Sequence, residues 1–385
     1  MKAAVTILVS CVAALLALGM VMLYSASMAL VNPRTHEVVG AHLLIMQLAW
    51  CVLGLAVCVM ATSLDYRLLK KFAWPLFGFA VLLLLSVYVP HLGRRLNGAR
   101  RWIGFGGVNF QPSEFAKLAL IIALAWYGEK FQRQMPALKR GILVPGVFIG
   151  LLLGLIFIEP DRGSTILLAA VSGIILLVAG VRWRYILPPI VLGAGVLAVS
   201  FWHDPMRSAR IYSWLHLEET KLDKGHQAYQ SILALGSGGW TGLGLGNGRQ
   251  TLGGWVPEQQ TDFILATIGE QLGLIATLLV IVAFMVIVLC GIYIALNSRD
   301  TFGLLLGCGI TFLIGLQAFI NIGVVTNTLP NKGLPLPFIS YGGSNLLMML
   351  ACVGVLLSVA RHARVPEARV IETIETEKIP SPELT

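Results

Sequence analysis

Long apolar stretches joined by polar connections make up most of this sequence. Nine of them reach or approach the roughly 20 residues that a helix needs to cross the hydrocarbon core of a bilayer. These nine are Val5–Leu30, Leu43–Ala61, Phe72–Val89, Ile142–Ile158, Ser164–Val181, Ile186–Phe201, Phe263–Leu296, Phe302–Val325 and Gly343–Ala360. A tenth stretch, Ser113–Tyr127, is shorter and contains Glu114 and Lys117, so hydropathy alone allows either a span or a re-entrant segment. The pattern predicts an all-α, polytopic integral membrane protein.

The distribution of basic residues favours counting the tenth stretch as a span. With ten crossings and an inner N-terminus, every inner loop contains lysine or arginine, as the positive-inside rule expects. The residues concerned are Arg67, Lys70, Lys71, Lys130, Arg133, Lys139, Arg140, Arg182, Arg184, Arg299, Arg361 and Arg364. We therefore predict ten transmembrane helices with both termini in the cytoplasm. The first helix is expected to be an uncleaved span, because its apolar run is longer than that of a typical signal peptide.

The connections divide the chain into a membrane domain, residues 1–360, and a charged tail, residues 361–385, which is expected to be flexible and cytoplasmic. The longest connection, residues 202–261, joins the seventh and eighth predicted helices on the outer side, and its four tryptophans favour an ordered structure. Its glycine run, Gly242–Gly248, follows no strand and opens no Rossmann helix, which excludes a nucleotide loop. Arg249, directly after this run, is a candidate to face an outer cavity.

Composition supports the membrane interpretation. Hydrophobic residues are 57% of the chain and charged residues 12%, which excludes an ordinary soluble protein and a disordered one. The net charge of +9 would raise nucleic acid as a partner of a soluble protein, but in a membrane protein it reflects loop orientation, so no nucleic-acid partner is expected. The six cysteines show neither metal-ligand nor redox spacing.

Two ionisable residues interrupt the tenth stretch. Glu114 and Lys117 are three residues apart and so share one face of a helix that begins at Pro112. They could form a pair that neutralises itself near the interface. Because ionisable groups inside spans are costly and normally face a polar cavity or a substrate path, the functional interpretation is favoured.

Asp262 stands where the longest outer connection enters an apolar helix. It could simply complement the helix dipole beside Thr261 as N-cap, or it could accept a proton from a substrate hydroxyl. Position alone leaves these two roles open. Glu270, about two turns deeper, is expected to be structural.

Further polar candidates lie on the same outer side. Four arginines, Arg94, Arg95, Arg100 and Arg101, oppose the positive-inside trend and suit either a phosphate or pyrophosphate ligand or anionic lipid headgroups. In the short turn at Glu159–Gly163, Asp161 and Arg162 either pair with each other or contact a substrate. The prolines and small residues of 334–344 predict non-helical backbone that lines a cavity at membrane depth.

Three motifs in this order resemble the SEDS family, the shape, elongation, division and sporulation proteins. They are Arg101-Trp102-Ile103 with Asn109–Lys117, Pro257-Glu258 with Thr261–Ile264, and Pro337–Ser344. The resemblance covers nearly the whole chain except the tail, and Gly242–Gln250 is more similar to the division branch than to the elongation branch. The chain departs from the family pattern at Gln260, where histidine is frequent, at Ser164, where threonine is common, and at Asn345, where serine is usual.

The resemblance implies a peptidoglycan glycosyltransferase that polymerises lipid II at the outer face of the bacterial cytoplasmic membrane. It implies a class B penicillin-binding protein as the crosslinking partner, together with other division or elongation membrane proteins. Asp262 matches the family's essential carboxylate, and Glu114 and Lys117 match its central polar cavity. We expect five residues to contact the substrate: Glu114, Lys117, Arg100, Arg101 and Arg249. No dedicated metal site is evident, although Mg²⁺ or Mn²⁺ could be held with the substrate pyrophosphate.

Two other functions use the same features. A flippase for the lipid-linked precursor would need the same polar cavity and the same phosphate-binding arginines. A scaffold that recruits a penicillin-binding protein would need only the membrane bundle, and Asp262 would then be dispensable. The length of the outer connection favours chemistry at the outer surface.

Overall fold

The computed structural model describes residues 1–27, 40–89, 92–96, 99–105, 108–202 and 205–363. Each of the ten predicted apolar stretches coincides with one helix. These helices are α1 (Lys2–Ser27), α2 (Gly40–Ser63), α3 (Leu68–Ser86), α4 (Pro112–Lys130), α5 (Val144–Ile158), α6 (Arg162–Val178), α7 (Trp183–Trp202), α12 (Ile264–Leu296), α13 (Thr301–Val325) and α14 (Gly343–Arg361). The predicted fold class, an α-helical polytopic membrane protein, is confirmed.

Length and composition do not settle the number of spans. Within the described residues, eight helices are long and apolar enough to cross a membrane. The other two are α6, which is apolar but has only 17 residues, and α4, which carries Glu114 and Lys117. The count of ten, and the assignment of both termini to one side, stay predictions. Most of the predicted tail, residues 364–385, lies outside the described part of the chain.

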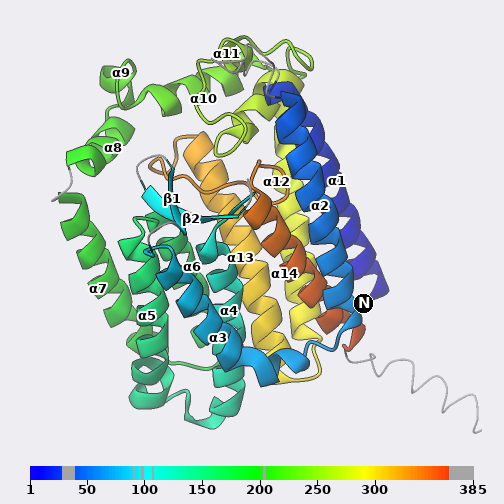
Figure 1. The fold of residues 1–385 in the computed structure, drawn as a ribbon, viewed down its shortest axis with the longest axis vertical. Coiled ribbons are helices and arrows are strands. Elements are labelled where there is room, and N and C mark those ends of the chain that lie inside the picture. The colour runs from blue at the N-terminus through cyan, green and yellow to red at the C-terminus, as the bar shows by residue number, and fades with distance from the viewer. Residues whose placement is uncertain (28–39, 90–91, 97–98, 106–107, 203–204, 364–385) are drawn as a thin grey trace, which may run out of the picture.

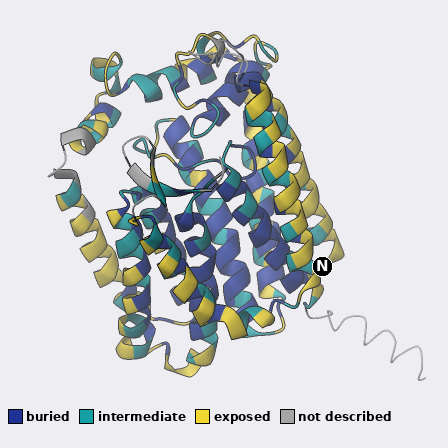
Figure 2. Ribbon diagram, viewed as in Figure 1, coloured by how far each residue is buried: buried dark blue, intermediate teal, exposed yellow. Residues whose placement is uncertain are grey.

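Three helices form the centre of the bundle. Most residues of α4, α13 and α14 are buried, whereas α1, α2, α3 and α5 expose apolar side chains at the periphery (Figures 1 and 2). Glycines bring α2 and α14 close together: a Cβ on Gly354 would lie 2.5 Å from the carbonyl oxygen of Cys58.

A small sheet departs from the helical pattern. Strands β1 (Gly93–Leu96), β2 (Ala99–Phe105) and β3 (Val108–Phe110) form an antiparallel sheet in the order β1-β2-β3. Arg94 pairs with Trp102 and Arg95 with Arg100, with an irregular register between Arg94 and Arg95. The segment predicted as a basic outer connection is therefore folded, and it sits over the N-terminal end of α4 (Figure 1).

The long connection between α7 and α12 is also ordered. It contains α8 (Pro205–Leu215), α9 (Leu217–Thr220), α10 (His226–Ser237) and α11 (Arg249–Leu252), which lie over one end of the bundle (Figure 1). We call this the cavity end; it also holds the C-terminus of α1 and the N-termini of α4, α12 and α14. Two side chains tie the connection to the turn after α13, because Trp214 donates to the carbonyl of Asn327 and Ser231 to that of Val325.

Candidate active site

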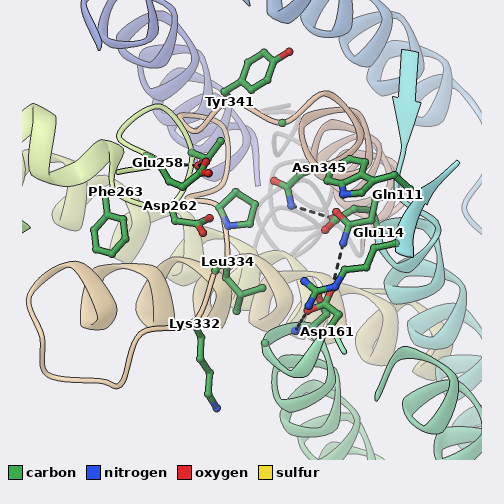
Figure 3. Close-up of a pocket in the computed structure, with 18 of the residues that line it drawn as sticks. Gln111, Glu114, Asp161, Glu258, Asp262, Phe263, Lys332, Leu334, Tyr341 and Asn345 are labelled. Carbon is green, nitrogen blue, oxygen red and sulfur yellow. Dashed lines mark hydrogen bonds between the residues drawn. The ribbon is translucent and has the colours of Figure 1, made fainter. Parts of the chain in front are cut away.

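A cavity of about 710 Å³ opens at the cavity end, beneath the long connection. Several segments contribute residues to its wall: α2, the sheet, the first turn of α4, the α5–α6 turn, α8, residues 258–263 and the loop before α14. Charged side chains of both signs line it: Glu114, Asp161, Glu258 and Asp262, with Arg101, Arg162, Arg210 and Lys332. Asp262 and Glu258 lie on one side and Glu114 and Asp161 on the other (Figure 3). Such a site can bind an anionic group beside a carboxylate.

Asp262 is held in place through its main chain. Asn321 of α13 donates Nδ2 to the carbonyl of Asp262 at 2.8 Å and to that of Leu334 at 2.7 Å, so one buried amide joins two loops. The Asp262 carboxylate packs directly against Gly333, where an added Cβ would lie 2.5 Å from Oδ2. Its location is therefore fixed by the loop that precedes α14.

The environment of Asp262 favours its protonated form. Burial raises the pKa of this carboxyl to about 7, the negative charges of Glu258 and Asp161 act in the same direction, and Arg101 opposes them. A carboxylate with a pKa near the working pH can both take up and release a proton, which is the requirement for a general base. The alternative role is not found as predicted: the N-cap of α12 is Phe263, Thr261 instead hydrogen-bonds to Glu258, and Asp262 lies before the first turn.

The loop before α14 is non-helical and lines the cavity, as the prolines and small residues predicted. Ser340 Oγ accepts the backbone N–H of Leu336 and donates to the carbonyl of Thr261. The N–H of Tyr341 donates to the carbonyl of Gln260, so the position where the family often has histidine contributes a backbone contact here. Gln47 of α2 donates to the carbonyl of Ser340, which fixes the loop from the other side.

Glu114 and Lys117 form a buried ion pair, with Nζ 2.8 Å from Oε1. Asn345 donates to the second oxygen of Glu114 at 2.9 Å, which gives this departure from the family pattern a structural role. Lys117 also donates to Gln317, whose amide donates to the carbonyl of Pro335 in the loop before α14. Glu114 belongs to the cavity wall and Lys117 lies behind it, so the pair neutralises itself and also supports the site.

The α5–α6 turn contributes a further carboxylate, that of Asp161, to the cavity wall. Asp161 caps α6 by accepting the N–H of Ser164 at 3.1 Å, and its other oxygen accepts Nε2 of Gln111 at 3.2 Å (Figure 3). Arg101 donates to the carbonyls of Glu159 and Pro160 and thereby braces the same turn. Burial, reinforced by the charge of Asp161, raises the pKa of Glu159 to about 8.

The predicted basic residues separate into three groups. Arg101 lines the cavity, and its contact with the substrate stays a prediction. Arg94 is exposed and donates to Asn109, while the side chains of Arg95 and Arg100 lie outside what the structure describes, so the role of Arg100 stays a prediction. Arg249 is exposed at the start of α11 and lies outside the described cavity wall. The structure thus does not bring Arg249 to the site.

Several lining residues were missed from the sequence. Arg210 of α8 and Lys332 stand in polar segments rich in other charges, where nothing in the pattern singles them out. Lys332 extends away from Asp262 (Figure 3). Asn321 could have been found, because it follows Gln317 by four residues and so shares one face of an apolar helix with it.

A metal would have to be held largely by substrate. Among the residues that the structure describes, no group of three or more histidine, cysteine or acidic side chains is placed to bind a metal ion. The cavity does offer single carboxylates, which suit a hard cation shared with phosphate oxygens. The divalent cation stays a prediction.

Glu270 is structural, as expected. Its carboxylate accepts the backbone N–H of Gln250 at 2.7 Å and that of Thr251 at 3.0 Å. These bonds fasten α11 to α12, outside the cavity wall. The residue therefore holds the long connection in place rather than serving the site.

Fold and site together define a polytopic membrane protein with a polar, carboxylate-containing cavity at one end of its helix bundle. The chain belongs to the FtsW/RodA/SpoVE family of cell cycle proteins, whose sequence profile matches residues 5–365. This confirms the family that the three motifs indicated.

Relatives and solved structures agree with this assignment. The chain is 41% identical over 351 residues to the probable peptidoglycan glycosyltransferase FtsW of Geobacter metallireducens, covering 91% of this chain and 93% of the relative. The corresponding protein of Coxiella burnetii is 38% identical over 356 residues, covering 92% and 95%. RodA of Thermus thermophilus superposes with a TM-score of 0.68 at 29% identity, covering 93% and 97%. A chain from a peptidoglycan synthase complex that coordinates polymerization and crosslinking superposes with a TM-score of 0.75 at 28% identity, covering 92% and 96%.

Proposed function

We propose that this protein is a peptidoglycan glycosyltransferase that polymerises lipid II during cell division. The observation that carries the proposal is Asp262, a fixed carboxylate with a pKa near 7 in a cavity that also contains cationic side chains. The FtsW relatives support the activity, since each is named a probable peptidoglycan glycosyltransferase, and the cell cycle family supports the division role.

In the proposed reaction, Asp262 removes the proton from the C4 hydroxyl of the acceptor N-acetylglucosamine. The oxygen then bonds to the anomeric carbon of the donor N-acetylmuramic acid, while the bond from that carbon to the undecaprenyl pyrophosphate oxygen breaks. The proton remains on Asp262 and the electron pair leaves with the pyrophosphate. One base and a pre-activated leaving group suit direct displacement with inversion of the anomeric centre.

Cationic side chains neutralise the departing pyrophosphate. Arg101, Arg162 and Arg210 line the cavity, and guanidinium groups hold phosphate oxygens bidentately. Lys117, which lies behind the wall in its ion pair, orients Glu114 instead of touching the substrate. If Mg²⁺ or Mn²⁺ takes part, Glu258 or Asp161 would hold it together with substrate phosphates and it would supply further neutralising charge.

We place the protein in the bacterial cytoplasmic membrane, with the cavity at the outer face and both termini in the cytoplasm. Basic residues support this orientation because they gather at the end opposite the cavity, where Lys70 bridges Glu129 and Asp300. The match to a synthase complex supports a class B penicillin-binding protein as partner, and membership of a cell cycle family is the basis for proposing other division membrane proteins as partners.

Transport of lipid II across the bilayer is the rival function, and it would need a polar route through the bundle. Beyond the Glu114–Lys117 pair, buried apolar side chains such as Ile121, Ile310 and Met349 fill the space between α4, α13 and α14. The described part of the bundle therefore favours a site that opens at one end. A scaffold without activity would not need the carboxylate at position 262.

The test is polymerisation of lipid II by purified protein, with and without the class B penicillin-binding protein. We expect wild-type protein to form glycan polymer and Asp262→Asn, which keeps the side-chain volume, to form none. Asp223→Asn is the matched control, since Asp223 is exposed in the long connection and should be dispensable. Equal polymer from wild type and Asp262→Asn would disprove the general base. Scrambling of lipid II in liposomes without any polymer would instead favour the flippase.

A further inference from the structure

The glycine run of the long connection hydrogen-bonds into a break in α12. Gly273 has φ 80° and ψ −177°, which interrupts the helix. At this point the N–H of Leu243 donates to the carbonyl of Glu270, and the N–H of Leu274 donates back to the carbonyl of Gly239. Similar bonds join Gly244 to Gln271 and Ile275 to Trp240. We call residues 239–246 the glycine segment; its glycines are needed because a Cβ on Gly242 would lie 2.2 Å from the carbonyl oxygen of Gln271.

The length of α12 places this break at the border of the membrane. The helix has 33 residues, whereas a span needs about 20. Its other end, Leu296, is followed by Asn297, Ser298 and Arg299 at the basic end of the bundle. Counting about 20 residues back from Leu296 reaches the region of Thr277, about one turn from Gly273.

Helix α1 independently places the border of the membrane at the same depth. It begins at Lys2 and reaches Ser25 after about the length of one span. There Ser25 donates to the side chain of Gln271, and the N–H of Gly246 donates to Ser25. Counted from the opposite end of the bundle, both helices therefore place the glycine segment at the hydrocarbon border.

The side chains of the segment suit a lipid environment. No charged residue occurs from Ser237 to Gly248. Trp240 is 70% exposed and Leu245 is 53% exposed, while backbone groups of the segment are bonded to α12. Non-helical backbone is tolerated near hydrocarbon when its polar groups are satisfied, and tryptophan is enriched at the membrane interface.

We propose that Trp240, Leu243 and Leu245 insert into the lipid interface at the cavity end and anchor the long connection there. The anchor holds α10 and α11 at the level of the lipid headgroups, which is also the level at which the pyrophosphate of a lipid-linked substrate lies. The proposal depends on the membrane placement of the bundle and not on the chemistry of Asp262.

The anchor is tested in protein whose six native cysteines are replaced. Single cysteines are then introduced and carry nitroxide labels. The labelled protein is reconstituted into phosphatidylglycerol-containing liposomes. Labels at Trp240→Cys and Leu245→Cys are compared with two references. The label at Leu279→Cys, on the exposed face of α12 within the span, is the lipid reference. The label at Leu222→Cys is the water reference, because Leu222 is 91% exposed between α9 and α10. Collision rates with oxygen and with a water-soluble nickel complex are measured by electron paramagnetic resonance.

We expect positions 240 and 245 to collide several-fold more with oxygen than with the nickel complex, as position 279 does. A preference for nickel matching position 222 would overturn the anchor. Protection from both reagents would overturn it as well, because it would mean that protein covers the segment. Each labelled variant must unfold at the temperature of its cysteine-free parent, and lipid II polymerisation by the same samples reports the proposed function separately.

Discussion

Adding one methyl group at Gly333 should displace the carboxylate on which the proposed chemistry depends. In Gly333→Ala the new Cβ would lie 2.5 Å from Oδ2 of Asp262, against an ordinary contact of about 3.4 Å, so the carboxylate must move by about 1 Å. The backbone itself tolerates alanine, since Gly333 is not among the glycines with positive φ. A misplacement of about 1 Å costs roughly 100-fold in rate, which corresponds to about 2.7 kcal/mol in the activation barrier.

The assay is the initial rate of lipid II polymerisation at saturating substrate, with thermal unfolding measured on the same preparations. Gly150→Ala is the control, because nothing lies within 4 Å of a Cβ at this position and its rate should stay at the wild-type level. We expect Gly333→Ala to lose rate without a comparable loss of substrate affinity. If it keeps more than half of the wild-type rate while Asp262→Asn is inactive, the position of the carboxylate is not critical and the reasoning fails.

Two further predictions concern the charges of the cavity. Because Asp262 must be ionised to act as a base and its pKa is raised to about 7, the polymerisation rate should increase with pH through a midpoint near 7. Glu258→Gln removes one of the charges that raise this pKa and should move the midpoint to lower pH; an unchanged midpoint would contradict the assignment. Lys117→Met should destabilise the protein by about 3–5 kcal/mol, because it leaves Glu114 buried without its cation. The double variant Glu114→Gln/Lys117→Met should recover most of the lost thermal stability, and equal melting of single and double variants would argue against a buried pair.

The helices could be predicted because their signal is local. The apolar length that marks a span lies within each stretch, and Pro112 correctly marked the first turn of α4. The sheet could not be predicted, since its strands are short and no alternating pattern indicates the pairing of Arg94 with Trp102. The break at Gly273 could not be predicted from the sequence either, because a single glycine in an apolar helix is usually tolerated without a break.

Residues of the cavity wall could be predicted where an ionisable group stood out against apolar sequence, as with Glu114 and Asp262. Lining residues were not predicted where they lie among many other charged residues. Arg210 reaches the cavity and Arg249 does not, yet both lie in the same polar connection. Their difference arises from the path of the connection over the bundle, which depends on contacts between segments more than 100 residues apart, such as Trp214 with Asn327.

The ion pair in α4 bears on how the protein is inserted into its membrane. A lysine or an acidic residue costs about 2.5–3.5 kcal/mol at insertion when it lies at the middle of a span and less toward the ends, and Glu114 and Lys117 lie in the first two turns of α4. The partners of the pair from other helices, Gln317 and Asn345, are synthesised 200 and 231 residues later than Lys117 and Glu114 respectively. During that interval α4 has to remain in the bilayer without them. Because Glu114 and Lys117 are one helical turn apart, each supplies the other's counter-charge within α4. The helix can therefore remain inserted before the rest of the bundle is synthesised.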